Sequence, residues 1–205
     1  MTGAPQPPLV FWFEFASPYS YLAAFRIGAA ATAAAIDHVW RPFLLGPILA
    51  HRGFADSPFN LDARKGDYMW RDLERLCARD DVGWRRPTVF PRSGLLAARV
   101  ATAVMAESWG RAFCRAVFRA NFADDRDITA AETIGEILRD LGQQPDAILA
   151  RAAAPATKEA LRAATATAEA QGVFGAPTFQ VGDELFWGQD RLADAIAWAT
   201  RGSTP

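Results

Sequence analysis

Strand-like sequence is confined to the two ends of this 205-residue chain, and that arrangement limits the folds it can adopt. Residues 9–43 begin with a bulky apolar run, continue as an alanine-rich helix over 19–34 and end in an alternating strand. Residues 172–201 predict a turn, a β-hairpin around Gly182-Asp183 and a closing amphipathic helix. A βαβ unit at one end must therefore combine with a ββα unit at the other.

The middle of the chain, residues 44–171, carries helical periodicity and no convincing strand. Thr129 and Glu132 have the spacing of a capping box and predict the start of one helix there. We expect an α/β fold whose βαβ and ββα halves (9–43 and 172–201) are separated by this large helical insertion in a single domain, 9–201. The helices expected in the insertion are 63–78, 94–107, 109–122, 130–141 and 155–171.

Composition narrows the function classes. Hydrophobic residues make up 51% of the chain, enough to bury a core without disulfides. The 22 basic and 23 acidic residues form no basic stripe, so a nucleic-acid partner is not expected. Without a membrane-length apolar run or a signal peptide, the chain is expected to be cytoplasmic, with residues 1–8 as a flexible tail. Cys77 and Cys114 are expected to be reduced structural thiols, and His38 and His51 lack metal-ligand spacing.

Ser17 has the best position for chemistry. It follows the first strand and precedes Pro18, at the start of a helix. A helix N-terminus stabilises a nearby anion by about 0.3–1 kcal/mol, and a hydrogen bond to a charged group adds about 1.5–3 kcal/mol. The alternative is that Ser17 only caps the helix.

Two further segments offer contacts to a ligand. Pro177 follows a glycine turn, so Ala176-Pro177 is a candidate cis peptide that would leave the Ala176 backbone free to pair with an extended ligand. A trans proline opening the strand is the alternative. At the start of the last helix, Gln189 and Asp190 are either capping residues or ligand contacts, with the Asp190 carboxylate meeting an ammonium.

Together these segments resemble the 2-hydroxychromene-2-carboxylate isomerases and kappa-class glutathione transferases of the DsbA-like thioredoxin group. The resemblance implies a DsbA-type thioredoxin-like fold and glutathione as cofactor. In this chain Ser17 would bond the glutathione sulfur, Ala176 would pair with the cysteinyl unit, Pro177 would be the cis-proline, and Gln189 and Asp190 would hold the γ-glutamyl end. The motifs that carry it are F-x-F-x-S-P-Y-S-Y-L at 13–22, R-P-F-L-L-G at 41–46, R-K-G-D-Y-M at 64–69, V-F-G-A-P-T-F at 173–179 and F-W-G-Q-D-R-L at 186–192.

The implied activity is a glutathione-dependent isomerisation between 2-hydroxychromene-2-carboxylate and trans-o-hydroxybenzylidenepyruvate, through reversible thiolate addition. A small aromatic substrate and a homodimer are expected with it, and a further glutathione contact within 55–60. Glu14, where Asp is more usual, and the loop 45–64 depart from the family pattern. A kappa-like transferase or peroxidase and a non-catalytic glutathione- or peptide-binding module remain alternatives. A disulfide oxidoreductase is disfavoured because serines, at 17 and 20, replace its two cysteines.

Overall fold

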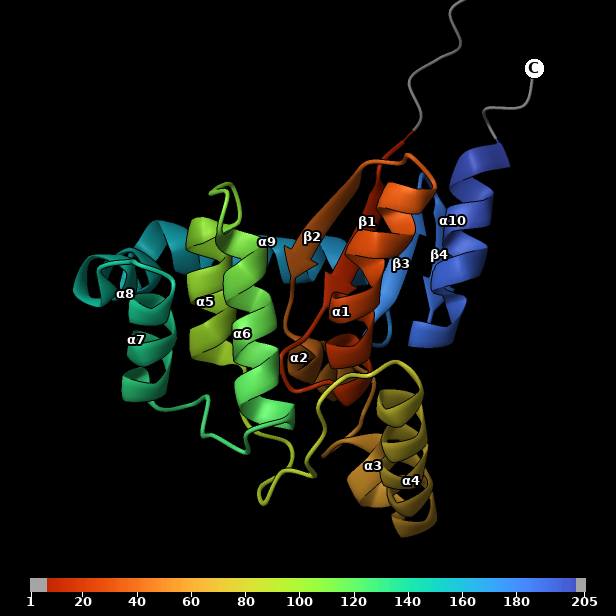
Figure 1. Cartoon of the computed structure of the whole chain (residues 1–205), viewed down its shortest axis with the longest axis horizontal. Helices are drawn as coiled ribbons and strands as arrows, with labels where there is room; N and C mark the ends of the chain where they lie inside the picture. Colours follow the sequence, from red (N-terminus) through yellow and green to blue (C-terminus); the bar gives the residue numbers. More distant parts are fainter. Residues whose placement is uncertain (1–6, 202–205) are drawn as a thin grey trace, which may run out of the picture.

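A mixed four-stranded sheet forms the centre of the molecule in the computed structural model, which describes residues 7–201 (Figure 1). The strand order is β2-β1-β3-β4, with β1 parallel to β2 and β3 antiparallel to both β1 and β4. All four strands come from the two end regions of the chain. The first region forms β1 (Leu9–Phe13), α1 (Pro18–Ala33) and β2 (His38–Pro42). The second forms β3 (Thr178–Val181), β4 (Glu184–Trp187), the short 3-10 helix η1 (Gln189–Arg191) and α10 (Leu192–Arg201). The predicted βαβ and ββα halves are therefore present. Residues 1–6 of the expected tail lie outside the described part of the chain.

The segment between β2 and β3, all of it described, contains helices joined by loops and no strand, as expected. It extends below and to one side of the sheet in Figure 1. The described helices in it are α2 (Leu45–His51), α3 (Pro58–Leu61), α4 (Ala63–Arg79), α5 (Leu95–Val104), α6 (Gly110–Phe122), α7 (Ala131–Asp140), α8 (Pro145–Ala153) and α9 (Pro155–Ala170). The sequence did not predict α2, α3 and α8, because each is short and is defined by its tertiary packing.

The predicted capping box is wrong. The N-cap of α7 is Ala130, which makes no side-chain cap bond. Thr129 is occupied elsewhere, since both its backbone N–H (2.9 Å) and its hydroxyl (2.7 Å) donate to Asp127 Oδ1. The Asp127 carboxylate thus accepts from the Thr129 N–H, the donor that the Glu132 side chain would bind in a capping box, and sequence spacing alone does not show that competition.

Both faces of the sheet are covered, by different helices. Leu9, Phe11 and Phe13 face the larger core together with α1, and Phe11 meets Trp40 of β2 edge-on at 5.1 Å between ring centroids. Trp12 points to the opposite face, into a smaller core that includes Ala168 of α9. Burial of each large side chain contributes about 1.5–3 kcal/mol, so the sheet forms a rigid support.

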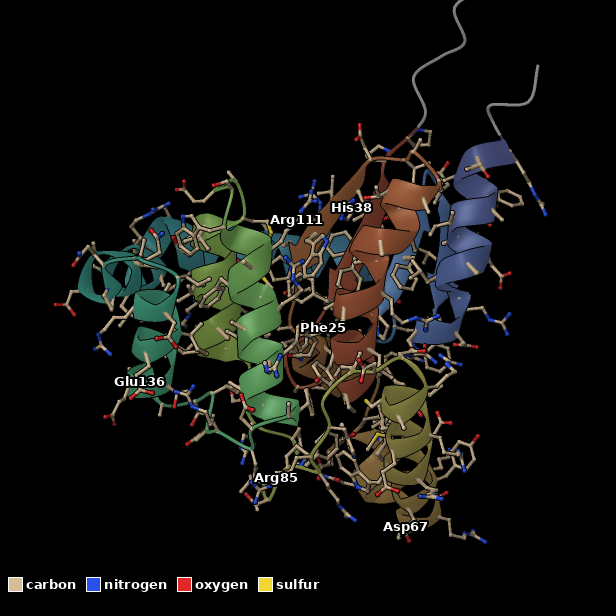
Figure 2. The ribbon with its side chains drawn as sticks, in the orientation of Figure 1. Phe25, His38, Asp67, Arg85, Arg111 and Glu136 are labelled. Carbon is tan, nitrogen blue, oxygen red and sulfur yellow. The ribbon has the colours of Figure 1, made fainter. Side chains whose placement is uncertain are left out.

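The β2 edge of the sheet is closed by a helix of the insertion. Arg111 of α6 donates to the carbonyl of His38 at 2.8 Å, and its guanidinium also lies 3.1 Å from the His38 ring nitrogen Nε2 (Figure 2). Burial and the positive charge of Arg111 lower the pKa of His38. His38 therefore has a structural partner at this edge.

Candidate functional site

Ser17 is the N-cap of α1. Its backbone is extended (φ −88°, ψ 115°), and its Oγ accepts a hydrogen bond from Ser20 N–H at 3.1 Å. Pro18 occupies the first helical position, where a missing N–H costs nothing. The rigid strand β1 ends four residues earlier, at Phe13, so the turn of residues 14–17 fixes where the helix begins. Ser17 is half-buried at the positive end of the helix.

The loop before β3 lies directly against this serine. The Ala176–Pro177 bond is cis, as predicted, and the Ser17 hydroxyl donates to the Ala176 carbonyl at 2.8 Å. Two segments from opposite ends of the chain therefore meet at one hydrogen bond, because β3 pairs with β1. The hydroxyl proton is used by Ala176 in this state, while the hydroxyl oxygen accepts from Ser20.

The η1 turn is tied to the same loop. Gly188 N–H donates to the Pro177 carbonyl at 3.0 Å, and Gly188 has a φ of 112°, which favours glycine. Asp190 is exposed, and its negative charge contributes to raising the pKa of Tyr19, which places it near the start of α1. Gln189 is buried, and its Oε1 accepts from Arg26 of α1. The Gln189 side chain therefore anchors the turn to α1, while the Asp190 carboxylate is open to solvent.

Glu14 is a buried carboxylate beneath the turn. It accepts from Leu45 N–H at 3.0 Å, at the start of α2, and from Ala16 N–H at 3.4 Å. Burial raises the pKa of Glu14, and these N–H groups lower it in part. Gly94 lies so close that a Cβ there would be 2.8 Å from Glu14 Oε1. The sequence marked Glu14 as unusual, and the structure shows that it joins three segments.

Tyr19 connects the start of α1 to helices α3 and α4. Its hydroxyl donates to Asp72 Oδ2 of α4 at 3.0 Å, and its ring lies 6.3 Å from the Phe59 ring. Burial, with the Asp72 charge, raises the pKa of Tyr19 well above its usual value. The hydroxyl therefore remains protonated at neutral pH.

An exposed cluster of aromatic rings and one cation borders the cis-proline loop. The rings of Phe174 and Trp187 lie 4.8 Å apart and are 42% and 56% exposed. The guanidinium of Arg52 lies 5.6 Å from the Phe174 ring and 6.0 Å from the Phe54 ring. The Trp187 indole packs against Gly175, next to Ala176. We call Arg52, Phe54, Phe174 and Trp187 the aromatic rim; the sequence did not predict it, because its members come from three distant segments.

A cavity of about 490 Å³ lies on the side of the site formed by α3, α4 and the loop that follows α4. It is lined by Asn60, Trp70, Arg86, Pro87, Thr88 and Phe90. The Arg86 guanidinium lies 5.0 Å from the Trp70 ring centroid. Asn60 lies in α3, within the residues 55–60 in which a further ligand contact was expected, and its neighbour Phe59 packs near Tyr19.

A second cavity, of about 320 Å³, lies between β1 and α9 and contains none of the predicted site residues. Over the residues that the structure describes, no helix is long and apolar enough to cross a membrane.

Known proteins share both this sequence pattern and this fold. The chain matches the family described as DSBA-like thioredoxin domain over residues 8–196. A 2-hydroxychromene-2-carboxylate isomerase of Sphingobium xenophagum is 29% identical over 184 residues, which cover 89% of this chain and 92% of that protein. Glutathione S-transferase kappa 2 of Caenorhabditis elegans is 24% identical, over 94% of this chain and 92% of its own length. The solved structure of a 2-hydroxychromene-2-carboxylate isomerase superposes with a TM-score of 0.85 at 24% identity, covering 94% of each chain.

Proposed function

The chain belongs to the DSBA-like thioredoxin domain family, and from this premise we propose that it is a glutathione-dependent isomerase of the 2-hydroxychromene-2-carboxylate type. The observation that carries the proposal is the contact between Ser17 and Ala176 at the N-terminus of α1. The turn of residues 14–17 holds a serine and no cysteine, so it can stabilise a thiolate but cannot supply one.

The protein's own thiols cannot replace an external one. Cys77 and Cys114 are both buried. Burial raises the pKa of Cys77 to about 12 and raises that of Cys114 as well. Because the thiolate is the reactive form, both cysteines are inert at neutral pH. A reaction at Ser17 therefore requires a thiol brought by a ligand.

The backbone of residues 174–177 gives such a ligand a direction. A tripeptide that pairs with Ala176 in antiparallel fashion would place its carboxyl end towards Phe174 and its amino end towards Pro177 and Gly188. Arg52 lies over Phe174, and Asp190 follows Gly188. The cation is thus on the side of the glycine carboxylate, and the carboxylate of Asp190 is on the side of the γ-glutamyl ammonium. This charge order favours one orientation of glutathione over the reverse one.

Ser17 would then act as a hydrogen-bond donor to the ligand sulfur. Pairing of a ligand N–H with the Ala176 carbonyl would release the Ser17 hydroxyl to donate towards sulfur. The dipole of α1 favours the same negative charge. Each unit by which the site lowers a thiol pKa corresponds to about 1.4 kcal/mol. Ser17 is therefore proposed to stabilise the thiolate, and Ser20 N–H would keep its oxygen in place.

Bound glutathione would supply a nucleophilic thiolate for reversible addition to a conjugated double bond. A flat aromatic carboxylate would fit the cavity that Asn60 and Trp70 line, where Arg86 provides a cation and Trp70 an aromatic wall. Similarity to the kappa-class protein supports a second candidate, transfer of glutathione to another electrophile.

An absorbance assay of chromene isomerisation with and without glutathione tests the proposal. We expect turnover only when glutathione is present. Turnover of a chlorodinitro arene alone would select the transferase instead, and glutathione binding without either reaction would select a non-catalytic module. Isomerisation that proceeds equally well without glutathione would contradict the role of the thiol.

A further inference from the structure

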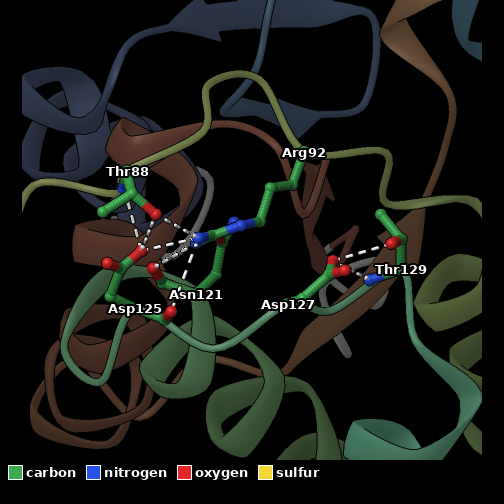
Figure 3. Close-up of polar contacts among 6 residues, drawn as sticks. All are labelled: Thr88, Arg92, Asn121, Asp125, Asp127 and Thr129. Atoms are coloured by element: carbon green, nitrogen blue, oxygen red, sulfur yellow. Dashed lines mark hydrogen bonds and ion pairs between the residues drawn. The ribbon is translucent and has the colours of Figure 1, made fainter.

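A half-buried ionic cluster, drawn in Figure 3, is linked by Asn121 to the turn that carries Ser17, and none of its members was expected from the sequence. Arg92 is 6% exposed and pairs with Asp125 at 2.6 Å between Nη2 and Oδ1. Thr88 bonds both partners: its Oγ1 accepts from Arg92 at 3.2 Å, and its N–H donates to Asp125 at 2.9 Å. The hydrogen bond from Thr88 and the charge of Arg92 lower the pKa of Asp125, so the pair is ionised at neutral pH.

Asn121 connects this cluster to the turn. Arg92 Nη1 donates to Asn121 Oδ1 at 3.1 Å, and Asn121 Nδ2 donates to the Phe15 carbonyl at 3.2 Å. Because a guanidinium can only donate, Arg92 forces the amide oxygen towards itself and the amide nitrogen towards Phe15. Asn121 is 2% exposed, so water does not compete for these bonds.

The peptide unit between Phe15 and Ala16 is therefore held at both of its polar atoms. Asn121 binds its carbonyl, and the Glu14 carboxylate accepts from its N–H at 3.4 Å. The next residue is Ser17, whose Oγ must reach the Ala176 carbonyl. Rotation of this single peptide unit would shift the serine hydroxyl, and a displacement of about 1 Å at a reacting centre can cost about a hundredfold in rate.

We infer that Asn121, oriented by Arg92, is a positioning residue that sets where Ser17 meets the ligand thiol. The expected change in rate and in thiol pKa rests on the proposed function. The expected shift of Ser17 relative to Ala176 does not depend on it. Asn121 touches neither Ser17 nor the thiol site, so its effect would pass through the Phe15 carbonyl.

Asn121→Asp tests the inference, because it keeps an acceptor for Arg92 and removes the donor to Phe15. The thiolate absorbance of bound glutathione, followed against pH below the melting temperature, gives the pKa of the bound thiol. We expect this pKa to rise by about one unit and kcat to fall about tenfold or more, with the dissociation constant of glutathione nearly unchanged. Asp125→Asn is the matched control, since it removes one charge of the ion pair with Arg92 and keeps the bond from Asn121 to Phe15; it should lower Tm without changing the thiol pKa.

A lower Tm in Asn121→Asp with an unchanged thiol pKa would overturn the inference and leave Asn121 a structural residue. If Asn121→Asp does not fold, Arg92→Lys loosens the hold on Asn121 while keeping the charge, and the same measurements apply. If the wild-type protein binds no glutathione, the proposed function fails, and crystal structures of wild type and variant then decide the inference. A longer distance from Ser17 Oγ to the Ala176 carbonyl in the variant supports it, and an unchanged distance contradicts it.

Discussion

The turn of residues 14–17 and the aromatic rim lie on either side of the cis-proline loop and are built in opposite ways. In the turn, Glu14 is buried and the Phe15–Ala16 peptide is held by internal hydrogen bonds. In the rim, Phe174 and Trp187 are largely exposed and depend on ring contacts. A group fixed before the ligand arrives can favour the transition state, whereas an exposed group mostly adds affinity. We therefore expect changes in the turn to alter the rate and changes in the rim to alter the affinity for glutathione.

The largest expected effect belongs to the turn. Ser17→Ala would remove the proposed hydrogen bond to the thiolate, which corresponds to about 1.5–3 kcal/mol, or roughly a ten- to hundredfold loss of kcat. The affinity for glutathione should change little, because the tripeptide has other contacts. Steady-state kinetics at saturating glutathione, with direct titration of binding, measure both quantities. Unchanged turnover would remove Ser17 from the chemistry.

Gly175→Ala should produce the next largest effect, because the added methyl group would clash with the Trp187 ring of the aromatic rim. A Cβ at residue 175 would lie 2.2 Å from the Trp187 indole nitrogen, so the loop or the ring must move. We expect about a tenfold weaker affinity for glutathione, measured by calorimetry, since Ala176 is the adjacent residue. The double variant Gly175→Ala/Trp187→Ala should bind glutathione no more weakly than Trp187→Ala alone, because the clash is then absent. Weaker binding by the double variant would mean that the glycine acts through backbone freedom and not through the ring.

Single charges at the two ends of the site should have smaller effects. Asp190→Asn and Arg52→Gln should each weaken glutathione binding about two- to fivefold and leave kcat nearly intact, as expected for exposed ion pairs worth about 0.2–1 kcal/mol. Arg162→Gln, an exposed cation of α9 that pairs with Glu159, is the control. Glutathione esterified at its glycine carboxylate should bind wild type and Arg52→Gln equally well. If wild type bound the ester more tightly than Arg52→Gln does, the proposed orientation would be contradicted.

The smallest effect concerns stability and pH. Burial raises the pKa of Glu14 above 4.5, so the folded protein binds this proton more tightly than the unfolded chain does. Its contribution to stability is complete below that value and is lost as the pH rises through the raised pKa. Lowering the pH from neutral to about 4.5 should therefore stabilise wild type relative to Glu14→Gln in urea unfolding. A difference that stays constant over this range would show that Glu14 does not titrate there.

The sequence predicted those parts of the site that depend on neighbours along the chain. Ser17 before Pro18 is a local signal for a helix start, and a proline after a glycine turn is one for the cis bond. The rim and the bond from Asn121 to Phe15 bring together residues from distant segments, and no local pattern marks such contacts. The prediction that Thr129 caps the helix was wrong for a related reason, since the Asp127 carboxylate binds both its N–H and its hydroxyl.

The pairing of β3 with β1 has a consequence for synthesis of the chain. Ser17 is translated 159 residues before Ala176, and β3, which pairs with β1, follows Ala176. A nascent chain on the ribosome thus has a complete α1 and no partner for its serine. Glutathione binding should begin only when the C-terminal segment has left the exit tunnel, so truncated products would lack the activity even where their helices fold.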